Sequence, residues 1–216
     1  ALKTNTALKT NTALKTNTAL KTNTVATEPE SLFRIASISK PITAVSILRL
    51  VDTQRLSLDE KVTDLLGMDA VQDDRWRTIT VRHLLEHRGG FDRKSSFDPM
   101  FADYRIRDAL GRSLPTTAQL VIDFMEPRSL DFDPGDRLAY SNFGYCLLGR
   151  VIEKVTGRSY QEYVRREVLD RIGVRRMRLA RTAKRLRAPG EVDYVDLRGG
   201  NSPTVLGKNS PPTVAT

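Results

Sequence analysis

The sequence predicts one domain of ordinary size that is predominantly α-helical. Two observations carry this prediction: apolar residues recur at helical spacing in five separate segments, whereas strong strand signals are scarce throughout the chain. Of the 216 residues, 39% are hydrophobic, which is enough to form a core, and 28% are charged, which is typical of a soluble surface. No run approaches the roughly 18 apolar residues that a membrane span needs.

The first two predicted helices differ in how much of their surface is apolar. Residues Ile42–Arg55 are apolar nearly all round, so we expect this helix to be buried on most sides. Residues Ile79–His87 show a short amphipathic pattern, in which Thr80 is typical of a helix start and Gly89–Gly90 of a stop.

Three more helices are predicted in the second half of the chain. Residues Thr116–Glu126 form an amphipathic segment that Pro127 ends. Residues Ser141–Gly157 form the second, with Gly157 typical of a helix end. Its apolar stripe comprises Tyr145, Leu148, Ile152 and Val155. The last clear helical pattern covers Ser159–Gly173.

The composition divides the chain into three parts. Residues 1–24 repeat the hexad ALKTNT four times, and we interpret them as a disordered low-complexity extension. Residues 25–190 have the composition of a folded domain, although a partial one for the reasons below. Residues 191–216 are rich in Pro, Ser and Gly and are predicted to be an irregular tail.

The net charge of +9 does not indicate a nucleic-acid partner. Four lysines lie in the repeats, which carry no acid, so the remainder of the chain is about +5 (9 − 4). Much of this lies in the arginine-rich run Arg171–Arg187, which lacks interleaved aromatics and any recognisable reading helix. We interpret the run as a solvated basic face. The single Cys146 excludes an internal disulfide.

Ser37 and Lys40 are the first candidates for chemistry. They stand three positions apart, so at the start of a helix their side chains share one face within a turn. A serine hydroxyl is a weak nucleophile until a neighbouring base takes its proton, and a lysine with a lowered pKa can be that base. The pattern alone is also compatible with a capping serine followed by a surface lysine.

Both histidines lie in the segment His83–Gly90 and spell H-x-x-E-H, a zinc-peptidase pattern. Such a site needs a third protein ligand. The sequence singles out none among the candidates Glu153, Glu162 and Glu167. We therefore expect no metal and keep a zinc peptidase as a minor alternative.

Three segments, in order, resemble the serine β-lactamase family, which includes penicillin-binding proteins and related esterases: FRIASISK at Phe33–Lys40, HLLEHRGG at His83–Gly90, and FDPGDRLAYSN with the helix that follows it. The closer likeness is to the class C β-lactamase and esterase branch, whose second motif, Tyr-x-Asn, is here Tyr140-Ser141-Asn142. The resemblance covers about Ser31 to Gly190 and implies an α+β β-lactamase/transpeptidase-like fold.

The resemblance implies a role for each motif residue. Ser37 is the acylated nucleophile, and Lys40 is its proton partner. Tyr140 carries the proton to and from the attacking group, as a phenolate or through Lys40, while Asn142 holds the substrate amide or orients Lys40. The family uses no cofactor, and its Thr80–Gly90 counterpart is a structural helix and turn that needs no metal.

The chain also departs from the family pattern. We find no Lys-Thr-Gly or His-x-Gly motif after Tyr140, and too few residues flank Ser37 and Tyr140 to build most of the central antiparallel sheet. We therefore expect an incomplete, apparently truncated fold, mostly helical, that exposes apolar helix faces and can self-associate. Two functions stay open: a serine hydrolase acting through an acyl-enzyme on an ester, β-lactam or D-alanyl peptide, and an inactive homologue that serves as an interaction module.

Overall fold

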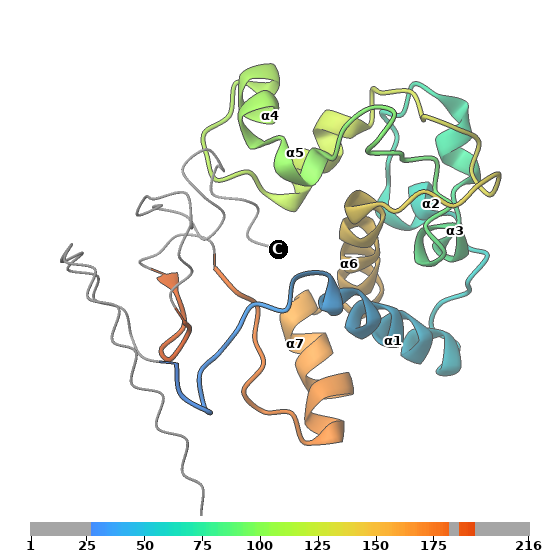
Figure 1. Cartoon of the computed structure of the whole chain (residues 1–216). Coiled ribbons are helices and arrows are strands. Elements are labelled where there is room, and N and C mark those ends of the chain that lie inside the picture. Colours follow the sequence, from blue (N-terminus) through green and yellow to red (C-terminus); the bar gives the residue numbers. More distant parts are fainter. Residues whose placement is uncertain (1–26, 182–185, 193–216) are drawn as a thin grey trace, which may run out of the picture.

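Helix α6 (Asn142–Thr156) lies at the centre of the fold (Figure 1). The computed structural model describes residues 27–181 and 186–192, so the ALKTNT repeats and the tail beyond residue 192 lie outside the described residues. The helices that contact α6 are α1 (Ser39–Asp52), α2 (Val62–Leu66), α3 (Val81–Leu85) and α7 (Tyr160–Val164). Two further helices, α4 (Asp103–Leu110) and α5 (Ala118–Met125), contact each other away from α1 and α7 (Figure 1).

The sequence of α6 accounts for its central place. Ser141 caps the helix by accepting a hydrogen bond from the backbone N–H of Gly144 at 3.0 Å, and Gly157 ends it in the left-handed region at φ +67°. The predicted bounds are confirmed. The predicted stripe is confirmed in part: Leu148 and Ile152 are fully buried, whereas Tyr145 and Val155 are only partly buried. Five apolar side chains on this helix are fully buried: Phe143, Leu147, Leu148, Val151 and Ile152. Full burial of such side chains contributes roughly 1.5–3 kcal/mol each, so α6 is the main apolar support of the fold.

The prediction that α1 is buried on most sides is wrong. One face of α1, which includes Ile47 and Leu50, packs into the core, but Val45 and Leu48 on another face are 45% and 48% exposed. In the described part of the chain, α1 packs chiefly against α6, α7 and the π-helical turn that follows α7. The apolar pattern indicates how much surface can be buried, and it cannot show how many neighbours are present to bury it.

Helix α3 begins as predicted and ends earlier than predicted. Thr80 accepts a hydrogen bond from the backbone N–H of His83 at 3.1 Å, and the helix stops at Leu85 rather than at the two glycines. His87 then adopts φ +57°, a left-handed conformation that breaks the helix before Gly89. The histidines of the H-x-x-E-H pattern therefore do not share one regular helix.

The remaining predicted helices are present with small differences. Helix α5 is capped by Thr117 and ends just before Pro127. The predicted helix over Ser159–Gly173 starts as α7, continues with π-helical bonding over Arg165–Leu169, and ends in a 3-10 turn before Gly173. Helices α2 and α4 were not predicted.

No strand occurs within residues 27–181 and 186–192. The only sheet-like pairing in this part of the chain is two isolated bridges, a parallel one between Leu32 and Glu191 and an antiparallel one between Lys61 and Thr80. The expectation of a mostly helical chain without most of the sheet is therefore confirmed.

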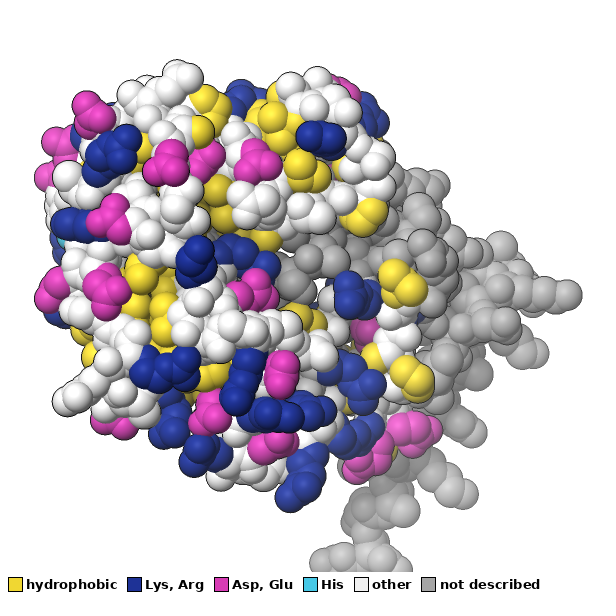
Figure 2. Space-filling model, turned by 180° about the vertical axis from the view of Figure 1, so that it is seen from behind, with side chains coloured by type: hydrophobic (Ala, Val, Ile, Leu, Met, Phe, Trp, Pro, Cys, Tyr) yellow, Lys and Arg dark blue, Asp and Glu magenta, His cyan; other side chains and the backbone are white. Residues whose placement is uncertain are grey.

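The surface of the described residues mixes both signs of charge. Figure 2 shows Lys and Arg side chains interspersed with Asp and Glu over the face seen from behind. In the described part of the basic run, Arg171 pairs with Glu167 at 2.8 Å and Arg176 pairs with Glu30. None of the helices in this part of the chain is long and apolar enough to cross a membrane.

A partly buried polar junction joins the 3-10 turn η2 (Asp74–Thr78) to the loop after α5. The carboxylate of Asp73 accepts hydrogen bonds from the side chain of Arg75 at 2.6 Å and from the backbone N–H of Leu130 at 2.9 Å. The hydrogen bond from Arg75 lowers the pKa of Asp73 to about 2. Beside it, the buried ring of Trp76 donates to the carbonyl of Arg128 at 2.9 Å. The junction fixes the loop that leads to Tyr140.

Replacing Asp73 by Asn should lower the free energy of unfolding near pH 7 by about 1–3 kcal/mol, because hydrogen bonds to a charged acceptor are lost. Since the pKa of Asp73 is lower in the folded chain, its contribution is present above pH 3.8 and is lost as the pH falls toward 2. The free energies of unfolding of Asp73→Asn and wild type, measured with urea, should therefore become equal as the pH falls toward 2. The matched control Asp74→Asn, at a 97% exposed side chain, should change little at either pH. An equal loss for Asp73→Asn at both pH values would contradict the assignment.

Candidate functional site

The first turns of α1 and α6 bring the predicted site residues together. Ser37 lies in the 3-10 turn η1 (Ala36–Ile38) that leads into α1, and Lys40 lies in the first turn of that helix. Tyr140 and Asn142 lie on either side of the residue that caps α6. The hydroxyl oxygens of Ser37 and Tyr140 are 2.6 Å apart, although the two residues are 103 positions apart in the chain.

Lys40 stands between the two halves of this cluster. Its ammonium nitrogen donates to Asn142 Oδ1 at 2.6 Å and to Ser37 Oγ at 3.3 Å. The same nitrogen lies 4.7 Å from the ring centroid of Tyr140, a cation–π distance. A hydroxyl, an amine, a phenol and an amide are therefore within reach of one another, and Ser37 is exposed to solvent.

The backbone just before Ser37 is strained. Ala36 adopts φ +44°, in the left-handed region, where a side chain with a Cβ is unfavourable by about 1–2 kcal/mol. Ala36 begins the 3-10 turn that leads into α1. Strained residues cluster at functional sites, and here the strain lies directly beside the exposed hydroxyl.

The surroundings of Tyr140 favour its charged form. Partial burial raises the pKa of the phenol, but hydrogen bonding to Lys40 and Ser37, together with the positive charges of Lys40 and Arg93, outweighs this and lowers it. The guanidinium carbon of Arg93 lies 4.9 Å from the Tyr140 ring centroid. The phenol is thus easier to deprotonate than an ordinary tyrosine.

His87 supports the two tyrosines rather than a metal. Its ring lies 4.6 Å from that of Tyr140 and 5.0 Å from that of Tyr145, centroid to centroid, and its Nδ1 accepts the backbone N–H of Ser141 at 3.2 Å. Burial, with the charge of Lys40, lowers the pKa of His87. The left-handed backbone of His87 thus turns its imidazole against the residues that precede α6.

His83 lies apart from His87 and packs between the start of α3 and the turn at Gly135. Its Nδ1 faces the backbone N–H of Thr80 at 3.4 Å, and its Nε2 faces Gly135 so closely that an added Cβ there would lie 3.1 Å away. In the described part of the chain, no group of three His, Cys, Asp or Glu side chains could hold a metal ion. The geometry therefore offers no basis for the zinc-peptidase alternative.

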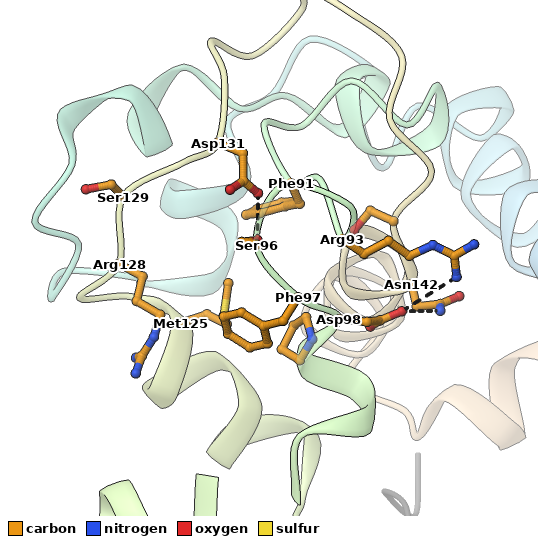
Figure 3. A pocket seen from close by; sticks show the side chains of 12 residues that line it. Phe91, Arg93, Ser96, Phe97, Asp98, Met125, Arg128, Ser129, Asp131 and Asn142 are labelled. Atoms are coloured by element: carbon orange, nitrogen blue, oxygen red, sulfur yellow. Dashed lines mark hydrogen bonds and ion pairs between the residues drawn. The ribbon is translucent and has the colours of Figure 1, made fainter. Parts of the chain in front are cut away.

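A small pocket opens beside Asn142, with a volume of about 50 Å³ (Figure 3). Its wall is partly apolar, from Phe91, Phe97 and Met125, and partly charged, from Arg93 and Asp98. Asp98 accepts a hydrogen bond from Asn142 Nδ2 at 2.6 Å. The sequence reasoning missed Arg93 and Asp98. The Asp98-Pro99 pair is a typical helix-start signal, but no sequence pattern reveals a contact to a residue 44 positions away.

The sequence of residues 11–205 matches the protein-family profile described as Beta-lactamase. The chain belongs to the beta-lactamase family. This family comprises serine hydrolases, including penicillin-binding proteins, esterases and amidases.

Two curated relatives and one solved structure illustrate this membership. The chain is 43% identical over 131 residues to a probable fimbrial assembly protein FimD, serogroup H1, from Dichelobacter nodosus, covering 61% of this chain and 31% of that protein. It is 32% identical over 165 residues to penicillin-binding protein 4 of Amycolatopsis lactamdurans, covering 76% and 40%. The structure of a D-stereospecific amidohydrolase from Streptomyces sp. aligns with a TM-score of 0.62 at 29% identity, covering 83% and 52%.

These likenesses show the β-lactamase/transpeptidase fold and also its partial extent. The chain spans well under half the length of the two curated relatives. The alignment covers 52% of the amidohydrolase chain, and the described residues form no strand, so the expectation of a partial, mostly helical member of this family is confirmed.

The phenol of Tyr140 should titrate below the ordinary value of 10.0, because nearby cations stabilise its phenolate. The phenolate absorbance of wild type is measured against pH, and the same curve for Tyr140→Phe is subtracted from it. The difference gives the titration of Tyr140 alone. Lys40→Met should move the midpoint upward, since a positive charge is removed. Tyr104→Phe, at a phenol 48% exposed on α4, should leave the low component in place. A Tyr140 midpoint at or above 10.0 in wild type would contradict the lowered pKa.

Proposed function

We propose that the chain carries the nucleophile and proton-transfer groups of a serine hydrolase that acts through an acyl-enzyme. The observation that carries the proposal is the 2.6 Å contact between the Ser37 hydroxyl and the Tyr140 phenol, with Lys40 within 3.3 Å of the same hydroxyl. A nucleophile next to a base, with a third group orienting that base, is the recurring arrangement of covalent hydrolases. In this proposal Ser37 is the nucleophile and Tyr140 the base.

Acylation follows from this geometry. Ser37 Oγ forms a bond to the substrate carbonyl carbon while its proton passes to the phenolate oxygen of Tyr140. The tetrahedral intermediate then collapses, the bond to the leaving group breaks, and the leaving oxygen or nitrogen takes the proton from Tyr140. The lowered pKa of Tyr140 places a larger fraction in the phenolate form near neutral pH, which is what a general base requires.

Deacylation reverses these roles. A water attacks the acyl carbon and gives its proton to Tyr140. Ser37 Oγ then leaves as the ester bond breaks, and it recovers the proton from Tyr140. Lys40 stabilises negative charge on the phenolate and the serine oxygen from 4.7 Å above the ring and 3.3 Å from Oγ. Asn142 holds Lys40 in this position by accepting its hydrogen bond.

The substrate class is an ester or amide that the site can acylate, with esters, β-lactams and D-alanyl peptides as candidates. Within the described ranges no strand lies beside Ser37, so a backbone donor from a cleft-lining strand is missing there. Removing one oxyanion-hole donor typically costs a factor of about 10²–10³ in rate. We therefore expect slow acylation, and a covalent adduct is a better measure than turnover.

Incubating the chain with p-nitrophenyl acetate or a penicillin at high concentration should produce an adduct of one acyl group, detected by intact mass. Ser37→Ala should abolish the adduct, because the attacking oxygen is gone. Ser39→Ala is the matched control: Ser39 is also exposed, two positions away, and its hydroxyl donates to Ala36 O at 2.7 Å. The Ser39→Ala variant should still be acylated at Ser37. Equal labelling of wild type and Ser37→Ala would exclude the mechanism.

The exposed face of α1 favours a second candidate function, that of an interaction module. Val45 and Leu48 are about half exposed one turn apart on α1, and Ile38 just before the helix is 67% exposed. Exposed apolar clusters mark association surfaces. Self-association through this face does not require the hydrolase chemistry, and the two functions can coexist.

If α1 mediates self-association, Val45→Lys/Leu48→Lys should raise the dissociation constant about tenfold or more, because two charges replace apolar contacts. Light scattering during size-exclusion chromatography over a concentration series measures this. Gln119→Lys adds a charge at an exposed position on α5 and should leave association unchanged. Wild type that remains monomeric at all concentrations would exclude this function.

A further inference from the structure

Asp98 lies outside every motif, yet it contacts the residue that holds Lys40. It follows Phe97 in the loop between α3 and α4 and caps the 3-10 turn η3 (Pro99–Phe101), accepting the backbone N–H of Met100 through Oδ1 at 3.1 Å. Its other oxygen, Oδ2, accepts from Asn142 Nδ2 at 2.6 Å. Figure 3 shows the Asp98 and Asn142 side chains pointing toward each other at the edge of the pocket.

The direction of these hydrogen bonds is fixed by chemistry. The two ends of an asparagine amide have nearly the same shape, so only their partners decide which end faces which way. An ionised carboxylate can only accept hydrogen bonds, so the amide nitrogen of Asn142 must face Asp98. Its oxygen then faces Lys40, and Lys40 must donate to it at 2.6 Å.

The opposite orientation would displace the amine. With its nitrogen toward Lys40, Asn142 would point a donor at another donor, so Lys40 would be repelled and would lose the acceptor that holds it beside Ser37 Oγ. The observed orientation instead uses one N–H of Lys40 for Asn142 and leaves the rest of the nitrogen facing Ser37 Oγ, 3.3 Å away.

Asp98 is well suited to hold this orientation. Its side chain is 12% exposed, and both of its oxygens are engaged. The guanidinium of Arg93 lies 4.0 Å from Oδ2, and the same guanidinium lies over the ring of Tyr140. One carboxylate thus connects to both halves of the proposed proton-transfer machinery.

We propose that Asp98 is a positioning residue that fixes the Asn142 amide with its oxygen toward Lys40, and thereby holds the Lys40 amine beside Ser37 Oγ and the Tyr140 ring, where its positive charge stabilises negative charge. This inference rests on the proposed hydrolase function for its kinetic consequence. The orientation of the amide itself can be measured without any activity.

The kinetic experiment measures the rate of Ser37 acylation by p-nitrophenyl acetate against reagent concentration. Asp98→Ser keeps a good helix cap but cannot reach Asn142, and Asp98→Asn keeps the shape but adds a donor. Both should lower the limiting acylation rate about 10- to 100-fold, as misplacement of a reacting group does, while the half-saturating concentration changes less than about twofold. Thr117→Ala, which removes the cap of α5, is the control for lost stability and should acylate at the wild-type rate.

A merely structural role for Asp98 would give a different result. The variants would then unfold at a lower temperature, as is expected of Thr117→Ala, and would still acylate at the wild-type rate. Wild-type acylation rates in Asp98→Ser and Asp98→Asn would overturn the proposal.

The second measurement separates this inference from the proposed function. The side-chain amide signals of Asn142 in a nitrogen–proton correlation spectrum, assigned by their loss in Asn142→Ala, should shift and exchange faster with water in Asp98→Ser. Unchanged signals would overturn the inference even if Ser37 is acylated. If wild type forms no Ser37 adduct but the signals shift as described, the hydrolase function fails and the positioning of Asn142 by Asp98 still stands.

Discussion

The contact between the first turns of α1 and α6 is the constraint on which the rest of the structure depends. One turn contributes Ser37 and Lys40, and the other contributes Tyr140 and Asn142. Buried residues farther along both helices, such as Ile47 on α1 and Leu148 on α6, are inaccessible to solvent and hold the helices together. Because both helices present their N-terminal ends to the cluster, their dipoles favour negative charge there. The apolar core and the polar cluster are therefore parts of one arrangement.

The polar cluster is organised by the direction of its hydrogen bonds as much as by distance. A carboxylate that only accepts, an amide with two distinct ends and an amine that donates form a chain from Asp98 through Asn142 to Lys40. Each group limits the choices of the next, so little reorganisation is needed when charge develops on the serine oxygen. His87 adds support from the other side by packing between two tyrosine rings.

The sequence was sufficient for features that depend on neighbouring residues, and insufficient for those that depend on distant ones. The bounds of α6 and the cap at Thr80 follow from local chemistry and were predicted correctly. The exposed face of α1 was mispredicted, because the apolar pattern of a helix does not show how many other elements pack against it. The four motif residues came from the family resemblance. Asp98 escaped prediction, because its role depends on a tertiary contact that no local pattern encodes.

The positive φ of Ala36 has a consequence for how this family member can evolve. A glycine at that position would relax the backbone, and any selection for heat resistance alone would favour such a change. The same relaxation would widen the range of directions in which the neighbouring hydroxyl points. Thermal stability and the orientation of the Ser37 hydroxyl therefore place opposite demands on residue 36. In variants selected only for thermal stability, we expect this position to change early and the serine to lose its fixed orientation.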